Sequence, residues 1–98
     1  MSETNFYYGV NTGTVIYMSE VEDLIKTLVF TIQDSSMPRN VRKVAEGVKN
    51  ILEDGSKPED LRRAKAIGLL DEVANDPNIP LHARSTIWTF VGRIESLA

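Results

Sequence analysis

Two aspartate and arginine pairs recur at one spacing, and they are the first candidates for chemistry. Asp34 precedes Arg42 by eight residues, and Asp76 precedes Arg84 by the same interval. Each pair spans a link and the first turn of a predicted helix, where free amides and the helix dipole favour an anion. The alternative is structural, with each aspartate capping its link or pairing with its arginine to set the turn. We favour the structural interpretation.

Groups that could catalyse a reaction are scarce. The chain has one histidine, His82, and no cysteine, which leaves no two-histidine metal site, thiolate ligand or cysteine nucleophile. No Gly-x-Ser-x-Gly segment and no glycine-rich phosphate loop is present. The carboxylates cluster in first turns and on polar faces, where they favour the helix dipole or stay solvated. The sequence therefore predicts no catalytic residue, no metal site, no cofactor and no enzymatic activity.

A group of basic residues lies in the second and third predicted helices. Its members are Arg39, Arg42, Lys43, Lys49, Arg62, Arg63 and Lys65. Such a patch could bind RNA. The net charge of -3 opposes strong phosphate binding, although a local patch can still dock on a larger ribonucleoprotein. Because alternating charge is common on exposed helices, a solvated face is the simpler interpretation.

Three large apolar residues fall outside the predicted inner faces of their helices. They are Phe30, Leu81 and Trp88, placed by stepping about 100° per residue around each helix. Aromatic residues are enriched where protein partners dock, so these three residues form a candidate interaction surface. We consider two hypotheses: they receive the aromatic N-terminal segment of the same chain, or they contact a partner or a second copy.

Four helical patterns position these residues. Apolar residues spaced three and four apart predict helices over about residues 20–33, from just after Pro38 to before Asp54, from Ser56 to about Asn75, and from Pro80 onward. Capping boxes are expected to open the first helix, at Ser19 and Glu22, and the third, at Ser56 and Glu59. The links between the patterns are short, so neighbouring helices should run antiparallel.

The segments Asp34–Arg42 and Asp76–Arg84 align with each other at an offset of 42 residues. They share an aspartate, a serine or asparagine, an apolar residue, a proline and an arginine, which indicates two similar helix pairs. A period of about 40 residues is typical of HEAT-type repeats, but two copies are too few for a solenoid. The sequence therefore predicts an all-α, antiparallel four-helix bundle made of two similar helix pairs.

The first 17 residues are rich in aromatic and β-branched types around a turn signal at Asn11–Gly13, which could form a short hairpin. An isolated hairpin is marginal in water, so a mobile or docked segment is expected. Met18-Ser19-Glu20 repeats Met1-Ser2-Glu3 closely, as if translation began upstream of the folded unit. We therefore expect an extension over 1–17 and a bundle domain over 18–98.

The stretch from Ser19 to Ala98 resembles a small archaeal family of all-helical cytoplasmic proteins that is known only as an uncharacterised protein family. The resemblance rests on Asp34 to Arg42, on Asp76 to Trp88 and on the Gly55-Ser56-Lys57-Pro58 turn, and it covers about four fifths of the chain. It implies a four-helix bundle, and it brings no activity, cofactor or catalytic residue. The family pattern is expected to start near Met18.

Length and composition indicate the number of domains and the cellular location to expect. A chain of 98 residues with 42% hydrophobic residues can fold as one domain. It lacks an apolar run near the roughly 20 residues of a membrane span and lacks a signal peptide, so a cytoplasmic location is expected. We predict a non-catalytic interaction module that binds a protein partner or itself. The alternative is an accessory factor that associates with ribosomal or other RNA through the basic residues.

Overall fold

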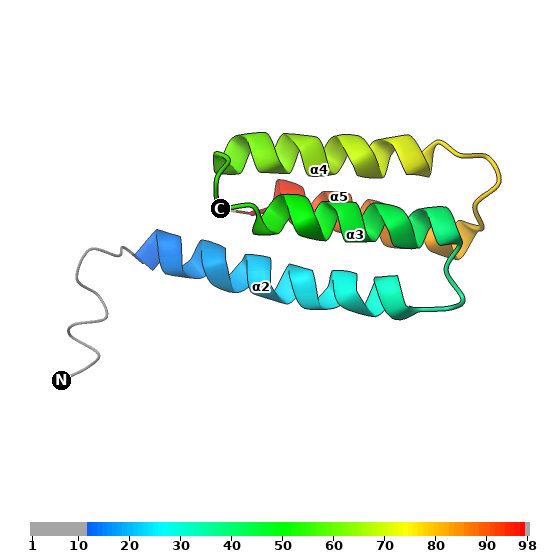
Figure 1. Ribbon diagram of the computed structural model, residues 1–98, viewed down its shortest axis with the longest axis horizontal. Coiled ribbons are helices and arrows are strands. Elements are labelled where there is room, and N and C mark those ends of the chain that lie inside the picture. Colours follow the sequence, from blue (N-terminus) through cyan, green and yellow to red (C-terminus); the bar gives the residue numbers. More distant parts are fainter. Residues whose placement is uncertain (1–11, 98) are drawn as a thin grey trace.

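The computed structural model describes the backbone of residues 12–97 and the side chains of residues 19–97. Over that range it consists of four α-helices and no strand (Figure 1). The helices are α2 (Thr12–Gln33), α3 (Arg39–Glu53), α4 (Glu59–Ala74) and α5 (Leu81–Glu95). The predicted all-α fold is confirmed.

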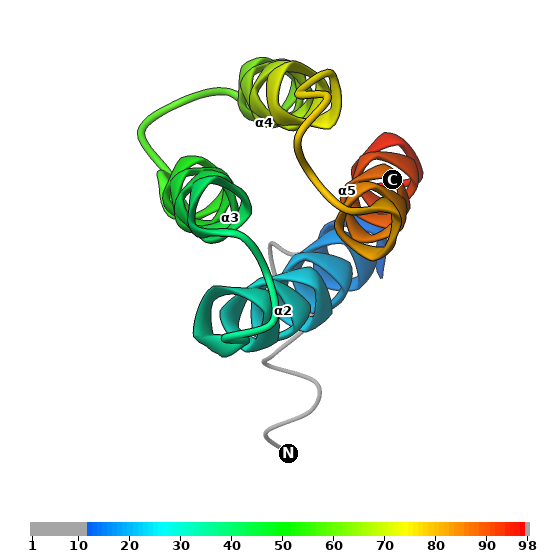
Figure 2. The same ribbon diagram turned by 90° about the vertical axis from the view of Figure 1, so that its right-hand side faces the viewer.

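Successive helices run antiparallel and contact each other in chain order, α2 with α3, α3 with α4 and α4 with α5 (Figure 1). Viewed along the bundle, the four helices occupy the corners of a quadrilateral (Figure 2). Helix α2 crosses the bundle obliquely, with its start beside α5 and its end beside α3. The arrangement is the expected four-helix bundle.

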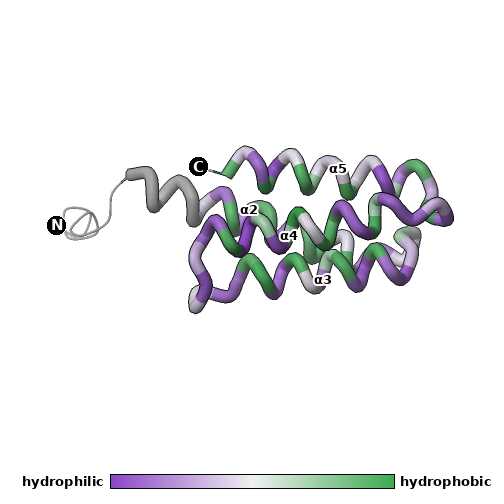
Figure 3. Tube along the Cα trace, turned by 90° about the horizontal axis from the view of Figure 1, so that it is seen from above, coloured by the Kyte–Doolittle hydropathy of each residue, from purple (hydrophilic) through white to green (hydrophobic). Residues whose placement is uncertain are grey.

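The core is built from residues on the inner faces of all four helices. Leu28 of α2, Val48 of α3, Ala66 of α4 and Ile94 of α5 are each completely buried. Figure 3 shows apolar positions, coloured green, along α3, α4 and α5, and the buried residues of α3, Val41, Ala45, Val48 and Leu52, lie three or four positions apart. This spacing follows the helix period, which turns such residues to one face, and burial of that face stabilises the bundle.

Prolines precede three of the helices. Pro38, Pro58 and Pro80 occupy the N-cap positions of α3, α4 and α5, with φ angles of -58°, -61° and -69°. Their rings fix φ near the helical value, and they lack the amide that the first turn would leave free. The expected capping box at Ser56 and Glu59 is wrong, because α4 has no side-chain cap bond.

Helix α2 begins earlier than we predicted. The predicted start at about residue 20 and the capping box at Ser19 are wrong, because the helix begins at Thr12 and runs through Ser19 without a break. Thr12–Tyr17 is therefore helical and does not form the second strand of a hairpin. Extending an existing helix adds one hydrogen bond per residue, which outweighs the small helix penalty of β-branched residues. The remainder of the expected extension, residues 1–11, lies outside the described residues.

Within residues 12–97, no helix combines the length and the hydropathy that a membrane span requires.

Candidate functional site

The first and third links are closed by aspartate side chains that accept hydrogen bonds from the link itself. The Asp34 carboxylate accepts bonds from the Ser36 amide at 2.9 Å and from the Ser36 hydroxyl at 2.7 Å. The Asp76 carboxylate accepts a bond from the Asn78 amide at 2.9 Å. Both are Asx turns, in which an aspartate holds the chain two residues ahead.

The arginines of the two links donate to backbone carbonyls. Arg42 Nε lies 3.2 Å from the Met37 carbonyl oxygen. Arg84 donates from Nε to the Ala74 carbonyl at 3.1 Å and from Nη2 to the Asp76 carbonyl at 2.8 Å. Carbonyls at the end of a helix have no partner within the helix, so a charged donor there satisfies them. Arg84 thus joins the end of α4 to the start of α5, and Arg42 holds the last residues of its link against the first turn of α3.

The middle link also has an aspartate turn and an arginine that donates to a carbonyl. The sequence comparison of the first and third links alone missed this similarity. The Asp54 carboxylate accepts bonds from the Ser56 amide and hydroxyl, and Arg62 Nη1 donates to the Leu52 carbonyl at 3.0 Å. The signal was present, because Asp34, Asp54 and Asp76 each begin the pattern Asp-x-(Ser or Asn)-x-Pro-x-x-x-Arg. The aspartate turn therefore recurs in all three links.

The first and third links differ from the middle one in what they bury. Met37 and Ile79, at matching positions, are buried and close the core at one end of the bundle. At that end Asn40 Nδ2 donates to Asp76 Oδ2 at 2.9 Å and ties the start of α3 to the third link. The matching residue of the middle link, at the other end of the bundle in Figure 1, is the exposed Lys57. This difference explains why only two links aligned on sequence.

Two link aspartates have perturbed acidity. The hydroxyl and the amide of Ser36 hold the pKa of the Asp34 carboxyl below its usual value of 3.8. The hydroxyl and amide of Ser56 lower the pKa of Asp54 in the same way. Hydrogen bonds to the ionised form favour that form. Both carboxyls are exposed, and the shifts belong to the turn geometry.

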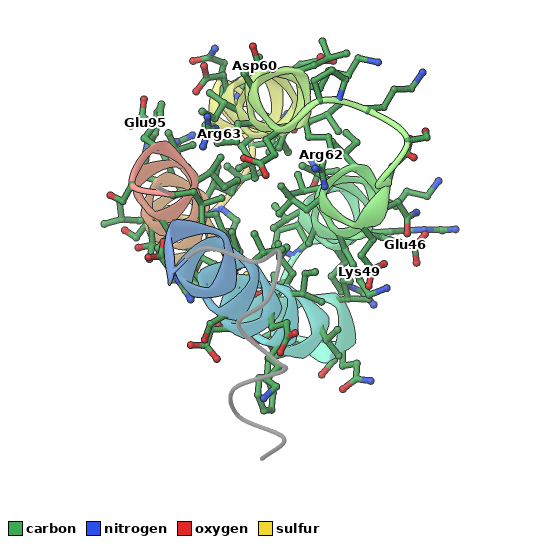
Figure 4. The ribbon with its side chains drawn as sticks, turned by 90° about the vertical axis from the view of Figure 1, so that its left-hand side faces the viewer. Glu46, Lys49, Asp60, Arg62, Arg63 and Glu95 are labelled. Atoms are coloured by element: carbon green, nitrogen blue, oxygen red, sulfur yellow. The ribbon has the colours of Figure 1, made fainter. Side chains whose placement is uncertain are left out.

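Most of the predicted basic residues have partners within the chain. Besides Arg42 and Arg62, Arg63 Nη1 donates to the Leu97 carbonyl at 3.2 Å, and Lys49 pairs with Glu53 at 2.8 Å. Figure 4 shows Arg62 directed toward α3 and Arg63 toward α5. The other three members, Arg39, Lys43 and Lys65, are exposed. The seven residues therefore do not share one free surface.

The three apolar residues singled out from the sequence are exposed. Phe30 and Leu81 are each 75% exposed and Trp88 is 49% exposed. Phe30 borders a hollow of about 370 Å³ whose lining residues all belong to α2, whereas Leu81 and Trp88 lie on α5. The candidate interaction surface is therefore divided into an α2 part and an α5 part. Leu61 of α4 is also 41% exposed.

The hollow on α2 is almost entirely apolar. It is lined by Ile25, Lys26, Val29, Phe30 and Gln33. Ile25 and Val29 are half-buried, yet neither belongs to the group of partly buried side chains that pack against the core. We name the side of the helix that carries these five residues the outer face of α2. Ile25 and Val29 also fit the three- and four-residue apolar spacing that predicted this helix, so spacing alone did not reveal this surface.

A second groove runs along the seam between α2 and α5. It encloses about 480 Å³, and its walls carry Glu20 and Asp23 on one side and Thr89 and Arg93 on the other. Arg93 Nη1 donates to Thr27 Oγ1 at 2.9 Å and joins the two helices. His82 is exposed and lines neither this groove nor the hollow on α2. Among the described residues, no three histidine, aspartate or glutamate side chains gather where they could hold a metal ion.

Comparison with known proteins gives a consistent result. The model of an uncharacterised protein family, UPF0147, matches residues 12–97. A relative from Pyrococcus furiosus is 35% identical over 88 residues, covering 85% of this chain and 95% of that protein. One from Methanothermobacter thermautotrophicus is 41% identical over 100 residues, covering 90% and 98%. The crystal structure of a UPF0147 protein from Thermoplasma acidophilum is 36% identical, with a TM-score of 0.78 and coverage of 85% and 98%.

These matches confirm the resemblance to an uncharacterised family found in archaea. The family match begins at residue 12, where α2 begins, so the expected start near Met18 is wrong.

Proposed function

This chain belongs to the uncharacterised protein family UPF0147, and from that premise we propose that it is a non-catalytic helical module of the cytoplasm that binds proteins through its outer helix faces. The exposure of Phe30, Leu81 and Trp88 carries the proposal. Scattered exposed apolar residues are ordinary on a folded protein, but large aromatic ones are enriched at interfaces. The apolar lining of the hollow on α2 supports the same interpretation.

Binding to RNA is the alternative, and it has less support. A basic surface contributes to nucleic-acid affinity through cations that are free to contact phosphates. Arg42, Arg62 and Arg63 donate to backbone carbonyls, and Lys49 pairs with Glu53. The three other basic residues are few for a phosphate-binding surface, so RNA binding becomes an outcome of the test.

The test is capture of partners by the full chain and by matched variants. Phe30→Ser and Trp88→Ser each replace an exposed aromatic side chain, and Lys43→Glu reverses an exposed charge on α3. We expect a bound protein to survive nuclease and high salt, to be lost with at least one aromatic variant and to be retained with Lys43→Glu. Circular dichroism melting checks that each variant stays folded.

The opposite pattern contradicts the proposal. Loss of the bound material after nuclease treatment and with Lys43→Glu, with both aromatic variants unaffected, supports the RNA alternative. A bound protein that neither aromatic substitution affects shows that these faces are not where proteins bind.

A further inference from the structure

Helix α2 carries apolar residues that its own bundle does not use. Leu24 and Leu28 are buried in the core, but Ile25, Val29 and Phe30 surround the hollow on the outer face. Lys26, Val29, Phe30 and Gln33 are spaced at i, i+3, i+4 and i+7, the four positions that form a hole for a side chain of a facing helix. The outer face of α2 therefore has the form of a helix-packing surface.

The same helix extends past the bundle at its other end. It has 22 residues, against 15 or 16 in the other helices, and its first turns project beyond the neighbouring helices in Figure 1. By the helix period, positions 15 and 18 share a face with positions 22, 26 and 29. The residues at 15 and 18 are valine and methionine. By sequence and helix period alone, apolar positions thus occur toward both ends of α2.

Charged residues separate these two apolar regions. Glu22 and Lys26 are exposed and lie one helical turn apart on this face. Among the described residues neither belongs to an ion pair, since the single pair formed is Lys49 with Glu53. Because the two charges have opposite signs, a second copy that runs in the opposite direction can place its Lys26 beside this Glu22 and its Glu22 beside this Lys26.

We infer that a second copy of this chain packs antiparallel on the outer face of α2, with Glu22 of each copy beside Lys26 of the other. In that register position 18 of one copy lies level with Phe30 of the other, and position 15 lies level with Gln33. The projecting turns of each copy then cover the hollow of its partner. One register thus matches both the charges and the apolar regions, as a twofold interface requires.

Parallel pairing fails the same test. It would place Lys26 against Lys26 and Glu22 against Glu22, which is repulsive. It would also place the two hollows against each other, so that the projecting turns would cover neither. The inference rests on the proposed function and specifies its partner as the chain itself.

The contact should be weak. A helix of 22 residues is about 33 Å long, and one helix pair of that length lies near the lower end of specific interfaces, at roughly 1,200 Å². We therefore expect a dissociation constant in the micromolar range, roughly 10–100 µM. Sedimentation of the full chain over a concentration series that brackets this range measures it.

Charge exchange tests the register. Lys26→Glu turns both central Glu22–Lys26 pairs of the contact into pairs of glutamates, and Glu22→Lys turns them into pairs of lysines. Each single variant should raise the dissociation constant at least about tenfold, the equivalent of roughly 1.4 kcal/mol. The double variant Glu22→Lys with Lys26→Glu restores opposite charges and should restore dimerisation. Lys43→Glu, on the exposed side of α3, is the matched control and should leave the constant unchanged.

Every outcome decides the inference. A dimer that is weakened by both single variants and rescued by the double variant supports it. A chain that stays monomeric throughout the series, a dimer that does not respond to one of the single reversals, or a dimer that the double variant does not rescue overturns it. None of those results contradicts the proposed function, because capture of another protein by Phe30 or Trp88 is measured separately. Melting curves exclude loss of fold as the cause.

Discussion

Helices α2 and α3 are neighbours in the bundle, but their outer faces differ. Helix α3 buries Val41, Val48 and Leu52 and presents charged and polar residues to solvent. Helix α2 buries Leu24 and Leu28 in the same way, and it also carries Ile25, Val29 and Phe30 around an exposed hollow. The needs of the core account for the apolar residues of α3. They do not account for those on the outer face of α2, which are available for another interaction.

Substitutions at two adjacent positions of α2 should differ most in their effect on the free energy of unfolding. Leu28→Ala removes a side chain that is completely buried, so it should lower the free energy of unfolding by about 2–5 kcal/mol. Val29→Ala lies on the outer face and should change it by less than about 1 kcal/mol. Urea unfolding at low protein concentration, where the monomer dominates, measures both. Equal losses would show that the outer face belongs to the core.

Substitutions at two adjacent positions of α3 should differ less in their effect on the free energy of unfolding. Arg42→Ala removes the donor to the Met37 carbonyl and should lower the free energy of unfolding by about 1–3 kcal/mol. Lys43→Ala, on the exposed face next to it, should stay within about 0.5 kcal/mol of the wild type. Thermal melting compares the two variants. A loss with Lys43→Ala as large as that with Arg42→Ala would contradict the view that this face only contacts solvent.

The link between α2 and α3 should give the smallest effect, and it depends on pH. The Ser36 hydrogen bonds lower the pKa of Asp34 in the folded chain, so the ionised carboxyl stabilises the fold above about pH 4. That contribution is lost as the pH falls through the folded pKa, because the unfolded chain takes up the proton more readily.

Ser36→Ala removes the largest cause of this shift and should move the pKa of Asp34 up toward 3.8. Carboxyl-carbon NMR titration measures the change, with Ser35→Ala in the same link as the control. An unchanged pKa in Ser36→Ala would show that the hydroxyl does not set the acidity of this carboxyl.

Much of the fold could be predicted from the sequence because helix periodicity and proline positions are local signals. The four helices follow from them, and so does the placement of Phe30, Leu81 and Trp88 outside the core. The start of α2 could not be predicted in this way, because Ser19 and Glu22 have the spacing of a cap whether or not the helix continues behind them.

The candidate sites were harder to predict because they depend on which residues share a surface. Ile25 and Val29 fit the apolar stripe of α2 by spacing, but neither side chain packs against the core. The basic residues formed one group by position in the sequence, but three of them donate to separate carbonyls, those of Met37, Leu52 and Leu97, and the group is therefore divided. Spacing along one helix cannot show either result, because both depend on the neighbouring elements.

The distance between two spin labels tests the central claim, the antiparallel pairing on α2, most directly. The chain has no cysteine, so Ser35→Cys places one label per copy in the exposed link after α2. In the antiparallel register the two labels should lie about 30–40 Å apart, from the rise of about 1.5 Å per residue. Pulsed electron resonance above the dissociation constant should give that distance. A distance below about 20 Å, expected for parallel helices about 10 Å apart, or no dipolar coupling at all, would contradict the account.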